Sequence, residues 1–346
     1  MNILLTSVGR RRYLVEYFKK ALGDDGRVHV MNSSELCPAF TAADVAVVSP
    51  FIYDDNYISF LLKYCKENRI DALLSCFDID LCILAKHKEY FKKIGTTVIV
   101  ADYDIDIICE DKWKTSVFLE DYGFQSPKTY INLDKALNDL NEGIIQYPVI
   151  IKPRWGMGSI SIYEADDSEE LKLLCNKAKK NIMKTYLKYE SSQNIEEAVI
   201  IQEKIIGQEY GLDIINDLNG NYVNTCVKKK YAMRSGETDC AITVDNKELR
   251  ILGEKISKIT KHPGNMDVDV FEKDNVYYVL EMNARFGGGY PFTHLAGVDE
   301  PKAIIKWLKG EDVDFSLVNP RFGVMGQKDI SIIELPVIME NSNEHR

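Results

Sequence analysis

Two short segments of the sequence carry residues whose types and spacing suit phosphate and metal chemistry. The first runs from Lys152 to Ser159 and contains Gly156 and Gly158. Glycines let backbone N–H groups approach phosphate oxygens, and Lys152, at the end of an expected strand, adds a fixed positive charge. No Gly-Lys-Ser/Thr follows and the next element has the pattern of a strand, so this is not a Walker loop. The segment predicts phosphate binding, although a plain hairpin turn fits the same residues.

The second segment joins acids, an amide and an arginine on one predicted hairpin. Glu281 and Asn283 point to the same face of an extended strand, and Asp269 lies on the partner strand. Oxygen ligands without imidazole favour Mg²⁺, which commonly binds one or two carboxylates together with substrate phosphates. Arg285, on the same face, can hold a phosphoryl oxygen. A solvated strand face with paired charges is the alternative, and the glycine run at 287–289 favours the site.

A third segment places Glu203 and Glu209 on either side of a glycine turn at Gly207. These carboxylates can serve an adenine edge and a ribose hydroxyl, and ordinary surface charge explains them equally well. Two histidines, His262 and His294, have no partner visible in the sequence and are interpreted as either packing or catalytic residues.

The elements that position these residues change in character near residue 111. Before it, short β-rich runs alternate with amphipathic helical patterns, which predicts βαβ units and a parallel sheet. Asp78 and Asp80 follow one strand of that sheet, where they bind a ligand or cap the next helix. The expected strands here are 2–6 and 72–75, and the expected helices are 11–22 and 57–68.

After residue 111 strands and hairpins outnumber helices, which predicts an α+β region. The expected strands are 148–152, 160–163, 199–204, 210–216, 222–230, 268–272 and 276–283, and the expected helices are 112–122, 168–180 and 248–260.

Composition bounds the class of protein. The 346 residues suffice for two to three domains, and a formal charge of -10 argues against a nucleic-acid partner. No apolar stretch is long enough for a bilayer span and the start lacks a signal-peptide pattern, so we expect a cytoplasmic protein that does not bind membranes. Eight scattered cysteines predict reduced, mostly buried thiols and no zinc site.

The order of these motifs resembles that of the ATP-grasp superfamily. The motifs are, in sequence order, Asp111-Lys112, Lys152 with its glycine loop, Glu203 to Glu209, Asp269, and Glu281-Met-Asn-Ala-Arg285. The last segment looks like the carbamoyl-phosphate synthase large subunit and its single-module relatives. The resemblance implies an α/β and α+β chain: an ATP-grasp fold with an N-terminal parallel-sheet domain. The implied domains are 1–110, 111–310 with a small lid subdomain at about 125–203, and a C-terminal tail at 311–346.

The resemblance also implies a role for each matching residue. Lys112 and Lys152 would contact ATP phosphates, covered by a flap that contains Gly156, Gly158 and Ser159. Glu203 would lie at the adenine-side hinge, Glu209 would bind the ribose, and Asp269, Glu281 and Asn283 would bind Mg²⁺. Arg285 would steady the transferred phosphoryl group, and Arg234, in a loop at 234–239 or simply at a charged hairpin tip, would face the acceptor. Gly9, Arg10 and Asp78 would fall near the substrate.

The implied activity is an ATP- and Mg²⁺-dependent ligase that joins a small carboxylate to an amine through an acyl phosphate. The synthase subunit contains two modules and this chain one, so carbamoyl phosphate is not its expected product. The alternatives are a ligase or carboxylase with another acceptor, and a nucleotide-binding regulatory protein. An NAD-type oxidoreductase is disfavoured, because the first turn has one glycine where three are expected. A homodimer is the default assembly.

Overall fold

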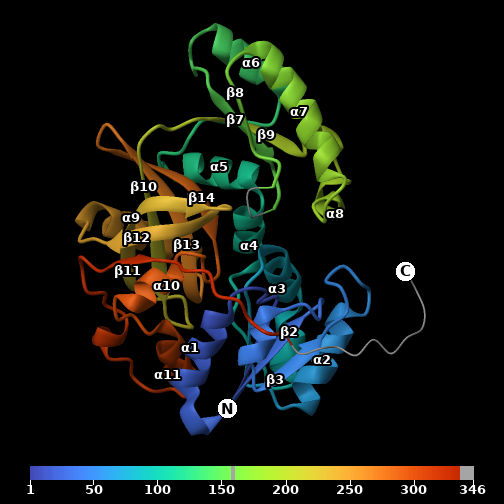
Figure 1. Ribbon diagram of the computed structural model, residues 1–346, viewed down its shortest axis with the longest axis vertical. Helices are drawn as coiled ribbons and strands as arrows, with labels where there is room; N and C mark the ends of the chain where they lie inside the picture. Colours follow the sequence, from blue (N-terminus) through green and yellow to red (C-terminus); the bar gives the residue numbers. More distant parts are fainter. Residues whose placement is uncertain (157–159, 336–346) are drawn as a thin grey trace.

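The computed structural model describes residues 1–156 and 160–335, which form three β-sheets (Figure 1). The first sheet has five parallel strands in the order β3-β2-β1-β4-β5. Its central strands are continuous apolar runs, as expected for strands covered on both faces. The strands are β1 (Asn2–Thr6), β2 (Arg27–Asn32), β3 (Val45–Val48), β4 (Ala72–Ser75) and β5 (Thr97–Val98), with helices α1 (Arg12–Leu22), α2 (Tyr57–Glu67) and α3 (Asp78–Lys93).

The second sheet has six antiparallel strands in the order β14-β13-β10-β11-β12-β15. Helix α9 (Lys247–Thr260) packs against β11 and β10, and its apolar face includes Leu249 and Ile256. The last strand lies in the expected C-terminal tail and pairs with β12. The strands are β10 (Gln208–Asn216), β11 (Tyr222–Arg234), β12 (Glu237–Thr243), β13 (Gly264–Lys273), β14 (Val276–Asn283) and β15 (Met325–Gln327). Helices α10 (Tyr290–Leu295) and α11 (Glu300–Leu308) lie between β14 and β15 in the sequence.

The third sheet belongs to residues 129–203, which we call the small unit. It projects from the rest of the chain at the top of Figure 1 and has the strand order β6-β9-β7-β8. Two helices, α4 (Tyr103–Glu110) and α5 (Lys112–Asp121), lead from the first sheet to the small unit. The small unit contains β6 (Thr129–Tyr130), β7 (Val149–Pro153), β8 (Tyr163–Ala165) and β9 (Val199–Glu203), with α6 (Leu133–Asn141), α7 (Ser168–Ile182) and α8 (Lys188–Ser191).

The predicted mixed fold with an N-terminal parallel sheet is therefore confirmed. One predicted strand, 160–163, is wrong: Ser161 has a positive φ of 55° and the chain is still turning there, so β8 begins only at Tyr163. All eight cysteines are buried and free, as expected. No helix in the described part of the chain is long and apolar enough to cross a membrane.

A buried ion pair joins two neighbouring strands of the six-stranded sheet. The ammonium group of Lys228 on β11 donates to the carboxylate of Asp213 on β10, and Thr293 of α10 bonds to both side chains. Lys228 is 1% exposed and Asp213 0%. Each of these two buried charges is compensated by the other, so we expect removal of one partner to lower the free energy of unfolding.

Candidate active site

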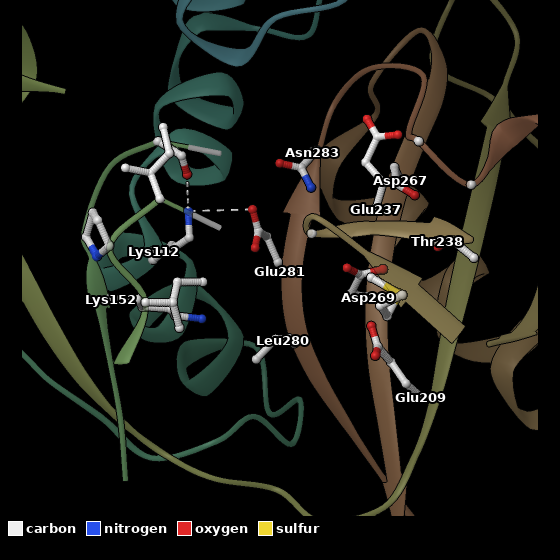
Figure 2. A pocket seen from close by; sticks show the side chains of 18 of the residues that line it. Lys112, Lys152, Glu209, Glu237, Thr238, Asp267, Asp269, Leu280, Glu281 and Asn283 are labelled. Atoms are coloured by element: carbon white, nitrogen blue, oxygen red, sulfur yellow. Dashed lines mark hydrogen bonds and ion pairs between the residues drawn. The ribbon is translucent and has the colours of Figure 1, made fainter. Parts of the chain in front are cut away.

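A cavity of about 330 Å³ lies between the small unit and the six-stranded sheet. Its volume is within the range of small-molecule sites. Figure 2 shows Lys112 and Lys152 on one side of it, facing a row of acidic side chains carried by the opposite strands. Eight of the residues predicted from the sequence line this one cavity: Lys112, Lys152, Gly156, Glu209, Asp269, Glu281, Asn283 and Arg285.

Lys112 is positioned by the start of α5. Asp111 caps this helix by accepting from the backbone N–H groups of Trp113 and Lys114. The same carboxylate accepts two bonds of 2.8 Å from Arg154, which ties the helix start to the residue that follows β7. The Lys112 ammonium then donates to the carbonyl oxygen of Gly156 at 2.5 Å and lies 3.5 Å from Glu281. Lys112 therefore links the glycine loop with the acidic strands.

Lys152 on β7 is 5% exposed. Burial lowers the pKa of its ammonium group to about 8, and nearby Glu281 acts in the opposite direction. The group still carries a charge near neutral pH, in a cavity that opens to solvent. A buried cation of this kind is a strong binding partner for a phosphate group.

The carboxylates lie on paired strands, as the hairpin pattern predicts. Asp269 on β13 is directly opposite Glu281 on β14, and Asp267 is opposite Asn283. Burial alone would raise the pKa of Glu281, but the cations of Lys112, Lys152 and Arg285 hold it below its usual value. Burial raises the pKa of Asp269. The three cations therefore favour the ionised form of Glu281.

Lys230 organises the acidic strands and was missed by sequence reasoning. It lies on β11 and donates to Glu209 at 2.7 Å and to Asp269 at 2.6 Å. Two unscreened carboxylates at this position would repel each other and a nucleotide phosphate. The sequence signal is the run of three lysines at 228–230, in which strand alternation places Lys228 and Lys230 on one face.

The first sheet contributes to the same cavity through two arginine contacts. Arg285 forms an ion pair with Asp78 at the start of α3, with Nε–Oδ1 and Nη2–Oδ2 distances of 3.0 and 3.1 Å. Arg11 lines the cavity and donates to the carbonyl oxygen of Phe286 at 2.8 Å. The predicted neighbour Arg10 is exposed instead. Asp78 thus binds an arginine and does not cap its helix.

Two glycines are required by their surroundings. A Cβ atom on Gly287 would lie 2.1 Å from the carboxylate carbon of Asp267. Gly156 has φ of 104°, and a Cβ atom there would lie 2.3 Å from Leu187. The first allows the chain to pass beside the acidic strands, and the second allows the backbone at Gly156 to pack against Leu187, just before α8.

Several predicted residues lie elsewhere. Glu203 ends β9, where its carboxylate accepts from the backbone of Lys128, and it is not among the described residues that line the cavity. Arg234 is half exposed at the β11–β12 hairpin tip, paired with Asp239, and is not among the described residues that line the cavity. Glu237 and Thr238 of that hairpin line the cavity in its place. Gly158 and Ser159 lie outside the described residues.

The two ambiguous histidines are packing residues. His262 is fully buried, bonded to the Thr260 hydroxyl and to the carbonyl oxygen of Ile214. His294 stacks on Tyr17 with 3.6 Å between ring centroids.

The donor set fits Mg²⁺ bound together with a nucleotide. In the described part of the chain no three His, Cys, Asp or Glu side chains gather as a self-sufficient metal site. Asp269, Glu281 and Asn283 offer two carboxylates and one amide on adjacent strands. Mg²⁺ commonly takes one or two carboxylates and completes its shell with substrate phosphates and water, so this set is sufficient.

Family models match two parts of the chain. Residues 109–289 match the ATP-grasp domain, and residues 3–99 match the PylC-like N-terminal domain. The first match covers just over half of the 346 residues. The chain therefore belongs to the ATP-grasp family, a class of ATP-dependent ligases.

Individual relatives are distant. The carbamoyl phosphate synthase large chain of Halomonas eurihalina is 27% identical over 239 residues, which is 65% of this chain and 20% of the relative. The chain thus spans about a fifth of that protein's length. The biotin carboxylase domain of Hydrogenobacter thermophilus 2-oxoglutarate carboxylase, solved with MgADP and bicarbonate, has a TM-score of 0.70 at 18% identity, covering 93% of this chain and 72% of that one. L-amino acid ligase from Bacillus licheniformis has a TM-score of 0.63 at 18% identity, covering 92% and 77%.

A buried acid beside the cavity makes stability depend on pH. Burial raises the pKa of Glu110 from 4.5 to about 7, with Asp78 and Glu190 acting in the same direction and a bond from the Cys82 thiol opposing it. The folded chain keeps a proton that the unfolded chain releases near pH 4.5. The stabilisation is therefore complete below pH 4.5 and is lost as pH rises through about 7.

We expect Glu110→Gln to remove this dependence. Between pH 5 and 7.5 the parent chain should lose roughly 2 kcal/mol of unfolding free energy relative to the variant. Urea unfolding at several pH values measures the difference. Buried His262, whose pKa burial lowers to about 4, has the opposite dependence but is present in both chains, so it cancels. Parallel pH profiles would contradict the prediction.

Proposed function

We propose that the chain is an ATP- and Mg²⁺-dependent carboxylate–amine ligase, similar in chemistry to the carbamoyl-phosphate synthase large subunit but with other substrates. Supporting this proposal, Lys112 and Lys152 face Asp269, Glu281 and Asn283 across a single cavity. A nucleoside triphosphate with a divalent metal requires cations for its phosphates and oxygen ligands for the metal, and the two walls of the cavity offer these groups.

The proposed reaction has two steps. A carboxylate oxygen attacks the γ-phosphorus as the bond to the bridging oxygen of ADP breaks, which produces an acyl phosphate. An amine nitrogen, once its ammonium form has released a proton to solvent, then attacks the acyl carbon, and it loses a second proton as inorganic phosphate leaves. When bound, Mg²⁺ would neutralise charge on the phosphate oxygens during the transfer.

The residues of this chain have separate tasks in that scheme. Lys112 and Lys152 bind phosphate oxygens, and Glu209 at the far end of the acidic row binds the ribose hydroxyls. Arg285, held in place by Asp78, stabilises the transferred phosphoryl group beside the carboxylate substrate. The walls of the small unit keep water from the acyl phosphate, which would otherwise hydrolyse.

Lys152 provides a direct test of nucleotide binding. Lys152→Met keeps the length of the side chain and removes its charge, so MgATP should bind roughly 10- to 100-fold more weakly, the worth of one charge-assisted hydrogen bond. Isothermal titration calorimetry measures the affinity. Lys172→Met, an exposed lysine on α7 of the same small unit, is the matched control and should bind as the parent does. Equal affinities in both variants would contradict the placement of the phosphates.

A regulatory protein would bind ATP without consuming it. ADP release measured with MgATP and pooled carboxylates crossed with pooled amines, bicarbonate and ammonia included, separates the two functions. A ligase shows turnover that requires one member of each pool. Tight MgATP binding without turnover in any pool would favour the regulatory alternative.

A further inference from the structure

A second cavity, of about 230 Å³, lies at the carboxyl edge of the first sheet. Ser7, Ser49 and Phe77 follow β1, β3 and β4, Asn32 is the last residue of β2, and all four line the cavity. The strand order reverses direction between β1 and β4, so this edge is the topological switch point of the sheet. Open parallel sheets bind their ligands at this position.

Aromatic rings form much of the wall. Phe51, Tyr53, Tyr57, Phe77 and Tyr186 all line the cavity, the last from the small unit. Tyr53 stacks on Tyr189 with 4.2 Å between ring centroids and an interplanar angle of 17°. The cavity is thus closed by rings from two parts of the chain that are far apart in sequence, and the faces of such rings attract cations.

The hydroxyl groups of the cavity wall bond to carboxylates. None of the described lining residues carries a formal charge, and two carboxylates bond to the tyrosines of the wall from behind. Glu190 accepts from the Tyr53 hydroxyl at 2.9 Å, and buried Asp80 accepts from Tyr57 at 2.8 Å and from Ser7 at 3.3 Å. An anion would be repelled here, whereas a cation has both aromatic faces and carboxylates.

A small pocket of about 10 Å³, which we call the passage, shares lining residues with both this cavity and the nucleotide cavity. Phe77 and Tyr186 line the passage and the second cavity, while Lys112 and Glu281 line the passage and the first. Glu110 also lines the passage, and it is 9% exposed. Its Oε1 atom has no hydrogen-bond partner among the described residues. This oxygen is free to accept from an N–H group of a ligand that reaches the passage.

We propose that this aromatic cavity binds the acceptor substrate, a small organic amine that arrives as its ammonium cation with an apolar or aromatic body. This inference rests on the proposed ligase function and adds the class of the second substrate. The rings hold the body, and the N–H groups point through the passage to Glu110 and the reacting carboxylate. An acceptor bearing its own acidic group is disfavoured by the surrounding carboxylates.

Benzylamine is the probe for the test, with benzyl alcohol as its neutral counterpart and benzoate as its anionic one. Ligand-observed NMR titration of the full chain at pH 7, without ATP, measures each affinity. We expect benzylamine to bind at least fivefold more tightly than either counterpart. Absence of benzylamine binding, or equal binding of benzyl alcohol, would overturn the proposal.

Variants locate the binding. Tyr53→Ala should weaken benzylamine binding at least fivefold, whereas Tyr53→Phe, which keeps the ring, should stay within twofold of the parent. Tyr90→Ala, a 54% exposed tyrosine outside the lining of this cavity, is the control. A Tyr53→Ala chain that binds like the parent would overturn the assignment, and its thermal midpoint shows whether it is folded.

The same preparation keeps the two proposals apart. If MgATP binds but benzylamine does not, the ligase function stands and the amine site is rejected. If benzylamine binding depends on Tyr53 but MgATP does not bind, the amine site stands and the proposed function is rejected.

Discussion

Replacing Glu281 by glutamine should reduce ATP turnover by a factor of roughly 10³. The variant keeps the shape of the side chain but removes the carboxylate that faces Lys112 at 3.5 Å and lies opposite Asp269. Several kcal/mol of charge stabilisation depend on such a metal ligand, and each 1.36 kcal/mol is a factor of ten in rate. ADP release at saturating MgATP measures the effect.

The effect should fall mainly on turnover and less on nucleotide affinity, because Lys112 and Lys152 remain in place. Glu248→Gln, an exposed acid in the first turn of α9, removes the same charge far from the cavity and should leave turnover unchanged. Turnover of Glu281→Gln within threefold of the parent would mean that Glu281 is not a metal ligand.

The second large effect concerns stability and not activity. Lys228→Met should lower the unfolding free energy by about 3–5 kcal/mol, because it leaves the carboxylate of fully buried Asp213 without its counter-charge. Urea unfolding followed by circular dichroism reports the loss as a lower midpoint. The position is distinct from Lys230, whose partners line the nucleotide cavity.

A double variant separates the charge from simple packing. Lys228→Met combined with Asp213→Leu removes both charges and should recover at least half of the lost stability, since apolar pairs often replace buried ion pairs without loss. If the double variant is as unstable as the single one, packing around Lys228 and not the unpaired carboxylate is the cause. A single variant that loses less than 1 kcal/mol would contradict the role of the pair.

The parts of the site that sequence could predict are local ones. Glu281 and Asn283 share a strand face by simple alternation, and the turn at 273–275 brings Asp269 opposite Glu281. Lys152 lies at the end of an apolar strand with a recognisable pattern. The first sheet was predictable for the same reason, because its short buried strands alternate with amphipathic helices.

The remaining residues depend on contacts between distant elements. Arg11 reaches the carbonyl oxygen of Phe286 across 275 positions of sequence, and no local pattern selects it over Arg10. Lys230 reaches Asp269 only because β10 lies between β11 and β13. Arg234 illustrates a different difficulty: register shifts in the β11–β12 pairing between Lys230 and Met233 break the alternation from which its direction would be inferred.

The ion pair between Asp78 and Arg285 bears on how this chain can be divided. A polypeptide that started at residue 109 would contain the whole match to the ATP-grasp domain. It would nevertheless lack Asp78 and Arg11, so the guanidinium group of Arg285 and the carbonyl oxygen of Phe286 would lose the partners they have here. The candidate site therefore extends beyond the residues that match the family. A fragment expressed from residue 109 would contain Arg285 but not Asp78, the residue that orients it here.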